Sequence, residues 1–222
     1  MRGKSVPAGG GLWLVLGLLL IIAALLLTSC NLYDSLRAER AVWRLLRNLT
    51  PELPAARQEE TPPTLSVETI PGPSGEAVPL SDMEMPVKTV DGQEIVGILS
   101  VPSLGLELPI LSQWSDSALK NAPCRYSGSV YRNDLILCGH NYTTHFGTLK
   151  NLREGDTVCF EDMAGNVFSY QVAGQELIQP DDPEAMAAGD WDLTLFTCTL
   201  GGKSRVSVRC TLCAAPTARP KG

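Results

Sequence analysis

The stretch LTLFTCTLGGKSRVSVRC, residues 193–210, reads as two short strands joined by a glycine-containing turn. The residues on both sides of the Gly-Gly pair fit the period-two pattern of half-buried strands. If the two strands pair as a hairpin, Cys198 ends the first strand and Arg205 begins the second. The pattern therefore predicts a thiol and a permanent positive charge together at one rim of a sheet.

A thiol needs a base or a cation nearby to act as a nucleophile, because free cysteine has a pKa of about 8.5 and is mostly protonated at neutral pH. The chain contains two histidines, His140 and His145, both within LILCGHNYTTHFGTL. His140 follows the apolar run 135–139 and is expected at the end of a buried strand, where it can lean over a neighbouring strand end. His145 lies in the polar turn that follows, so we expect it to be solvated and structural.

Composition and cysteine spacing exclude several classes of function. The 222-residue chain has a net charge of −6 and no basic cluster in its folded part, which argues against nucleic acid as a partner. Cys210 and Cys213 form a C-x-x-C with no second pair and no adjacent histidine, and the carboxylates are not clustered, so we expect no metal and no cofactor. A local disulfide between these two cysteines stays open. Cys124, Cys138 and Cys159 are expected to be small core residues.

Residues 1–30 read as a cytoplasmic tip followed by a transmembrane signal anchor. The apolar run 12–27, with its borders, is long enough to cross a bilayer as one helix, and no A-x-A-type cleavage site follows it. We therefore expect a single-pass protein of the cell membrane with the bulk of the chain outside the cell. Two observations keep alternatives open. Several arginines follow the span, against the usual positive-inside bias, and residues 27–30 resemble a lipobox, in which Cys30 would become a lipidated N-terminus.

Three further segments differ in composition. Residues 31–49 have the apolar spacing of a juxtamembrane helix that lies on lipid or packs on the domain, with self-association as the alternative. Residues 50–87 contain eight of the sixteen prolines and are expected to form an extended linker. The folded domain is expected at residues 88–213, followed by a disordered tail at residues 214–222.

Short strand candidates follow one another through the folded domain, at residues 94–101, 107–111, 135–139, 157–161 and 167–172, before the two strands described above. Turn signals such as Asp91-Gly92 separate them, and helical patterning is limited to residues 117–121 and 144–152. Many short strands at this spacing predict a β-barrel or a β-sandwich.

Five segments together resemble the sortases, the membrane-anchored cysteine transpeptidases of Gram-positive bacteria: GILSVPSLGLELPI, APCRYSGS, LILCGHN, FGTLKNLREGD, and TLFTC with an arginine after six further residues. The resemblance implies an all-β dominated fold, a closed eight-stranded sortase-type β-barrel with short helices, preceded by an N-terminal transmembrane helix. It also implies two partners. One is a C-terminal sorting-signal peptide of the Leu-Pro-x-Thr-Gly kind, cut between Thr and Gly. The other is an amine acceptor such as a peptidoglycan precursor or a pilin lysine.

Matched position by position, the resemblance implies that Cys198 is the nucleophile, His140 the general acid/base and Arg205 the cation that stabilises the oxyanion. Thr197, in the TLxTC pattern, is assigned a supporting role in substrate binding. The chemistry of these residue types agrees, because a thiolate forms a thioester, an imidazole protonates the leaving amine, and a guanidinium offers rigid donors to a developing oxyanion. Arg209 has the same strand parity as Arg205 but lies roughly 13 Å further along, so it is expected to be solvated or structural.

Subclass and activity are less closely determined. Residues 173–192 contain no long inserted helix, which departs from the iron-related class of sortases. The chain also shows no Asp-Pro-Trp/Phe-like lid motif, which favours the anchoring of surface proteins over pilus assembly. Two other functions stay open: a hydrolytic cysteine peptidase, and a catalytically silent membrane-anchored binding module.

Overall fold

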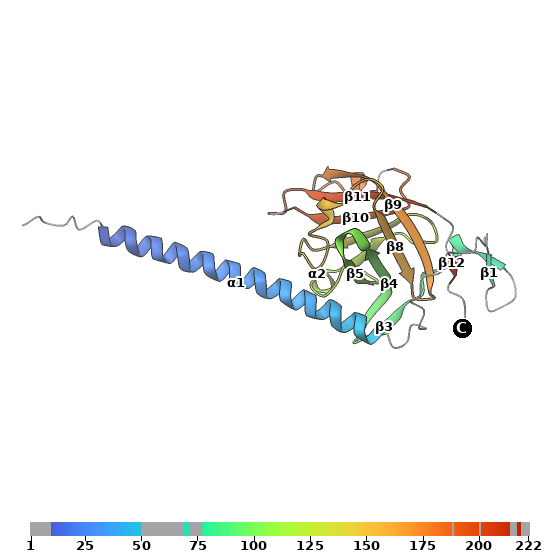
Figure 1. The fold of residues 1–222 in the computed structure, drawn as a ribbon, viewed down its shortest axis with the longest axis horizontal. Coiled ribbons are helices and arrows are strands. Elements are labelled where there is room, and N and C mark those ends of the chain that lie inside the picture. The colour runs from blue at the N-terminus through green and yellow to red at the C-terminus, as the bar shows by residue number, and fades with distance from the viewer. Residues whose placement is uncertain are drawn as a thin grey trace, which may run out of the picture. The chain divides into compact units, whose positions relative to one another are not determined.

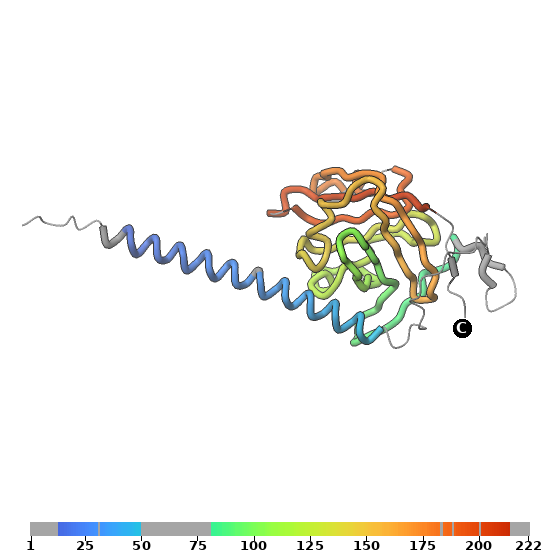
Figure 2. The backbone as a smooth tube through the Cα atoms, viewed as in Figure 1, coloured from blue at the N-terminus to red at the C-terminus, as the bar shows by residue number. Residues whose placement is uncertain are grey.

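A computed structural model of the chain describes residues 10–49, 69–71, 77–187, 189–199, 201–213 and 217–218. The contacts divide the chain into two compact units, residues 1–37 and 38–222. Figure 1 shows the described helices and strands, and Figure 2 traces the backbone by residue number. The start of the predicted cytoplasmic tip (residues 1–9), most of the predicted linker before residue 77, and most of the predicted tail lie outside the described residues.

The second unit is built on one large sheet. In the described residues its strands are β3 (Lys88–Val90), β4 (Gln93–Val101), β5 (Leu106–Leu111), β6 (Cys124–Ser127), β7 (Leu135–Gly139), β8 (Thr157–Asp162), β9 (Asn166–Ile178), β10 (Leu193–Cys198), β11 (Arg205–Leu212) and β12 (Thr217–Ala218). Eight of these described strands follow one another in the order β11-β10-β7-β6-β5-β4-β8-β9, and β9 also pairs with β11. This last pairing closes the ring, so the predicted eight-stranded barrel is confirmed. β3 and β12 add to its edges by pairing with β4 and β9.

Apart from the long helix α1 (Gly10–Leu49), the remaining described elements are short. They are β1 (Thr69–Pro71) and β2 (Ala77–Pro79), which form a separate two-stranded sheet, the 3-10 turns η2 (Leu80–Asp82), η3 (Pro102–Leu104) and η4 (Leu149–Asn151), and the helices α2 (Asp116–Leu119) and α3 (Pro183–Ala187). The helix expected at residues 144–152 is limited to η4, because tight turns occupy residues 141–148. β9 runs to Ile178, six residues beyond the predicted strand end, because it pairs with β11 along that extension.

The barrel holds a core of buried apolar side chains that includes Leu99, Phe160, Phe168 and Tyr170, none more than 1% exposed. Among the buried polar residues, Asp162 lies at the end of β8 and is 0% exposed. Its carboxylate accepts hydrogen bonds from Tyr131 Oη (2.6 Å), Asn166 Nδ2 (2.8 Å) and the backbone N–H groups of Ala164 (2.8 Å) and Asn166 (2.9 Å). These four donors compensate for the cost of burying a carboxylate and fix the turn between β8 and β9.

A single helix, α1 (Gly10–Leu49), contributes to both units. In the first unit its apolar side chains are exposed, with Trp13 72% and Leu27 73% exposed. Residues Trp13–Leu49 form a helix that is long and apolar enough to cross a membrane. In the second unit, by contrast, one face of the last turns of the helix is buried, while Trp43 on another face is 66% exposed.

The buried helix residues Val42, Leu45, Leu46 and Leu49 belong to the same core cluster as the barrel side chains. Asn48 Nδ2 donates a 3.1 Å hydrogen bond to the carboxylate of Asp91 in the turn between β3 and β4. Residues 31–49 are expected to lie on lipid, to pack on the domain or to self-associate. Residues 38–49 pack on the domain. The contacts of this compact unit begin at Ala38, and a folded domain that starts at residue 88 remains a prediction.

Candidate active site

Cys198 and Arg205 face each other at the turn end of the β10–β11 hairpin. The antiparallel register pairs the two residues directly, and Arg205 Nη1 donates a 3.0 Å hydrogen bond to Cys198 Sγ. Cys198 is half-buried, so its sulfur combines access to solvent with a fixed positive neighbour. A guanidinium in this position stabilises negative charge on the sulfur.

The turn that joins the two strands holds this register. Thr199 bonds Ser204 through its backbone N–H (2.8 Å) and through its Oγ1 (3.0 Å), both donated to the Ser204 carbonyl. Gly201 and Gly202 have φ angles of +81° and +69°, in the left-handed region that glycine adopts without steric cost. The Gly-Gly pair therefore allows the chain to reverse tightly enough to bring Arg205 opposite Cys198.

His140 is brought to the same rim by strand β7. β7 pairs with β10 in parallel, and the last register pair is Gly139 with Thr197. His140 and Cys198 each follow one residue later, at the carboxyl ends of strands that lie about 4.8 Å apart in a sheet. The His140 carbonyl accepts a 3.0 Å hydrogen bond from the backbone N–H of Phe146, which turns the chain sharply after the strand. The three residues singled out in the sequence thus lie at the ends of neighbouring strands on one edge of the barrel.

His145 differs from the sequence-based expectation, since it is fully buried (0% exposed) and not solvated. Burial lowers the pKa of its imidazole to about 4; the charge of His140 adds to the effect and the Asn121 backbone partly opposes it. The ring of Tyr142 packs against both histidines, with its centroid 4.8 Å from that of His140 and 5.5 Å from that of His145. His145 is therefore a neutral, buried packing residue at pH 7.

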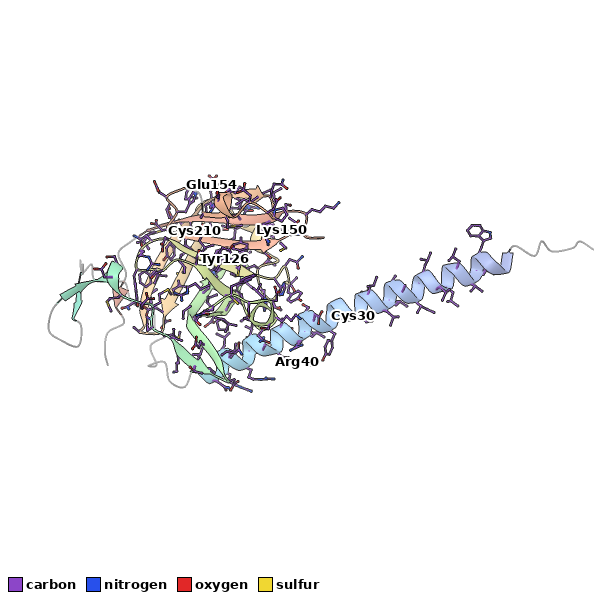
Figure 3. All side chains as sticks on the ribbon, turned by 180° about the vertical axis from the view of Figure 1, so that it is seen from behind. Cys30, Arg40, Tyr126, Lys150, Glu154 and Cys210 are labelled. Carbon is purple, nitrogen blue, oxygen red and sulfur yellow. The ribbon has the colours of Figure 1, made fainter. Side chains whose placement is uncertain are left out.

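An aromatic row leads from the surface to Arg205. The Arg205 guanidinium carbon lies 5.6 Å from the centroid of the Phe196 ring. Tyr126 meets Phe196 edge to face at 5.3 Å, and Trp114 meets Tyr126 at 6.1 Å. Figure 3 labels Tyr126 on the barrel. Such contacts stabilise a cation above the ring face and fix its orientation.

A pocket lies beside Arg205 on this face of the barrel. Its lining residues are Trp114, Tyr126, Phe196 and Arg205 from the sheet side, and Pro180, Asp182 and Met186 from the segment between β9 and β10. A second pocket continues along β7 and β10 and shares Met186. The sequence analysis did not identify these wall residues, although Tyr126 lies within APCRYSGS and Phe196 occupies the variable position of TLxTC.

Thr197 lies on the other face of β10. It is 4% exposed and alternates with Phe196 and Cys198, so its side chain points away from the pocket-bearing face. Its Oγ1 is buried without a hydrogen-bond partner. A contribution of Thr197 to substrate binding remains a prediction.

The other cysteines occupy different environments. Cys124, Cys138 and Cys210 are buried, and burial raises the pKa of the Cys124 and Cys210 thiols to about 12. These thiols stay protonated and unreactive at neutral pH. Cys159 is only partly buried, unlike the core residue expected. Cys210 and Cys213 are both free thiols, the second exposed.

Comparisons with known proteins all point to one family. A family model described as a sortase domain matches residues 99–213, more than half of the 222-residue chain. The Sortase A of Bacillus anthracis is 28% identical over 116 residues, which cover 50% of this chain and 55% of that protein. The chain thus spans about half the length of this curated relative.

Two solved structures share the fold. Sortase A from Corynebacterium diphtheriae matches with a TM-score of 0.51 and 21% identity, over 59% of this chain and 64% of that chain. Sortase C of Streptococcus pneumoniae matches with a TM-score of 0.50 and 20% identity, over 59% of this chain and 74% of that chain. The family model, the curated relative and the closed barrel agree: this chain belongs to the sortase family.

Proposed function

We propose that the protein is a cysteine transpeptidase that cleaves a Leu-Pro-x-Thr-Gly-like sorting signal and transfers the acyl group to an amine. The observation that carries this proposal is the 3.0 Å hydrogen bond from Arg205 to the sulfur of Cys198, with His140 at the adjoining end of the parallel strand β7. Membership in the sortase family supports it.

In the proposed reaction, the Cys198 thiolate attacks the carbonyl carbon of the threonine in the sorting signal. A tetrahedral oxyanion forms, and the Arg205 guanidinium stabilises its charge. His140 protonates the departing glycine amine as the C–N bond breaks, leaving a thioester on Cys198. An incoming amine then attacks the thioester and His140 accepts its proton. The C–S bond breaks, which releases the new amide and returns Cys198 to the thiolate.

The proposed partners are the sorting-signal peptide of a secreted protein and an amine of the cell wall, with a pilin lysine as the alternative acceptor. The apolar part of α1 supports a single-pass anchor in the cell membrane. The proposed acceptors lie outside the cell, so the proposal places the catalytic domain there as well. In this arrangement the pocket beside Arg205 receives the sorting motif.

The test uses the full-length protein in detergent micelles and a fluorogenic Leu-Pro-x-Thr-Gly peptide library, with and without triglycine or a lysine peptide as acceptor. The expected result is an amine-linked product in wild type and none in Cys198→Ala or His140→Ala. Cys213→Ala, which removes an exposed thiol outside the site, is the matched control and keeps activity.

Other outcomes identify other functions. Cleavage that gives only the free acid, whatever the acceptor, indicates a hydrolytic cysteine peptidase. Absence of cleavage across the library, together with no preferential labelling of Cys198 by iodoacetamide, indicates a silent binding module. Either result overturns the proposed transpeptidase.

A further inference from the structure

Arg209 is a buried cation that connects three elements around the pocket-bearing face of the barrel. It is 4% exposed, which excludes the solvated alternative of the sequence analysis and leaves the structural one. Its Nη1 donates to the Met186 carbonyl (2.6 Å) and to Thr194 Oγ1 (3.0 Å), and its Nη2 donates to the Ala185 carbonyl (2.6 Å). Its Nε forms an ion pair with the carboxylate of Glu176 on β9.

These contacts fasten α3 to the barrel. Ala185 and Met186 lie in the last turn of α3, where carbonyl groups lack partners within the helix. A cation at this end also interacts favourably with the helix dipole. A helix of five residues is not stable alone. The planar fork of an arginine can serve two neighbouring carbonyls and a carboxylate at once, whereas a lysine ammonium cannot reach all of them.

The position of α3 determines one wall of the pocket beside Arg205. Met186 is 3% exposed and lines both this pocket and the one that continues along β7 and β10. Pro180 and Asp182, from the same segment, complete that wall. Thr194, the partner of Arg209 on β10, lies four residues before Cys198 on the same strand. Arg209 itself lines the second pocket, whereas it reaches the pocket beside Arg205 only through this wall.

We propose that Arg209 is a positioning residue that holds residues 179–187 as the specificity wall of the peptide groove. The proposal rests on the proposed function, because it assumes that a peptide occupies the pocket. In this proposal Arg209 determines how well the peptide side chains beside Met186 fit the groove. It takes no part in the chemistry at Cys198.

The test compares full-length wild type in detergent micelles with Arg209→Met, Arg209→Lys and Glu176→Gln. Arg153→Met, at an exposed arginine, is the matched control. Three quantities are measured: KM and kcat for a Leu-Pro-x-Thr-Gly peptide, hydrogen exchange of the amides in residues 179–187, and the rate of Cys198 labelling by iodoacetamide.

For Arg209→Met we expect a rise in KM of roughly tenfold with kcat changed less, because a charge-assisted network that shapes binding is lost. Amide exchange in residues 179–187 should quicken while the Cys198 labelling rate stays constant. Arg209→Lys and Glu176→Gln should each show a rise in KM and faster amide exchange that are smaller than those of Arg209→Met. Arg153→Met should match wild type.

Unchanged KM and unchanged exchange in Arg209→Met overturn the proposal, as does a proportional loss of kcat and Cys198 labelling, which indicates a general structural role. If Arg209→Met does not fold, Glu176→Gln and Thr194→Val take its place, because each removes one contact of Arg209. The same KM, amide-exchange and labelling measurements on these two variants then test the proposal. If wild type cleaves no peptide, the proposed function fails, and hydrogen exchange still shows whether Arg209 holds the wall.

Discussion

Cys198 and Arg205 are opposite neighbours in an antiparallel pair, and the 3.0 Å between Sγ and Nη1 follows from this register. The relationship depends on the Gly201-Gly202 turn, because a longer or slipped turn would move the guanidinium away from the sulfur. Cross-strand pairing thus gives a cysteine a permanently charged partner without any contribution from distant loops.

Replacing Arg205 by lysine should separate charge from geometry. Lys keeps the positive charge but loses the planar donors, so we expect kcat/KM to fall about a hundredfold. The measurement is steady-state cleavage of the peptide by the full-length protein. Lys203→Arg, at an exposed position in the adjacent turn, should be indistinguishable from wild type. Retention of more than about a third of the wild-type kcat/KM in Arg205→Lys would show that the charge alone suffices.

Phe196→Leu should weaken the support of the Arg205 side chain. The substitution removes the ring that lies 5.6 Å from the guanidinium and 5.3 Å from the Tyr126 ring. A loss of about 1 kcal/mol, or roughly fivefold in kcat/KM, is expected from such contacts. In the double variant with Arg205→Lys the two effects should be less than multiplicative, because both act on one side chain. Fully multiplicative effects would contradict the coupling.

His145 should make the domain less stable at acidic pH. The unfolded chain binds a proton on this residue near the ordinary pKa of 6.5, whereas the folded protein keeps it neutral down to about pH 4. Stability should therefore fall as pH is lowered through this window, by about 3 kcal/mol for the full difference. Urea unfolding of wild type and His145→Phe at pH 7 and pH 4.5 checks this. An equal loss of stability in both proteins would exclude His145 as its source.

The buried carboxylate of Asp162 should dominate the stability of the β8–β9 turn. Asp162→Asn places an amide donor against groups that already donate, and we expect a loss of about 3 kcal/mol. Tyr131→Phe removes only the 2.6 Å hydrogen bond from Oη and should cost about 1 kcal/mol. The unfolding free energies of both variants are measured against wild type. A larger loss in Tyr131→Phe than in Asp162→Asn would contradict this order.

Features set by short-range sequence patterns could be predicted from the sequence. Strand alternation and the Gly-Gly turn give the hairpin of Cys198 and Arg205, and the apolar run before Gly139 places His140 at a strand end. The closed barrel came from the resemblance, since the strand pattern alone left a sandwich open.

Features set by long-range packing could not be predicted. The polar residues around His145 suggest a solvated turn, and only the fold shows that its side chain is fully buried. Arg209 looks like an exposed strand residue until α3, distant in the sequence, covers it. The burial of Val42 and Leu46 depends in the same way on a surface that the helix sequence alone does not reveal.

The last turns of α1 give the anchor a second task. Val42, Leu45 and Leu49 are part of the barrel's core cluster. The helix that contains the apolar span therefore also completes the core of the folded domain. A protease that severed the chain just after Leu49 would not simply shed an intact enzyme into the medium. The released barrel would expose the apolar surface that the helix had covered. Detachment from the membrane would therefore also cost the domain part of its native packing.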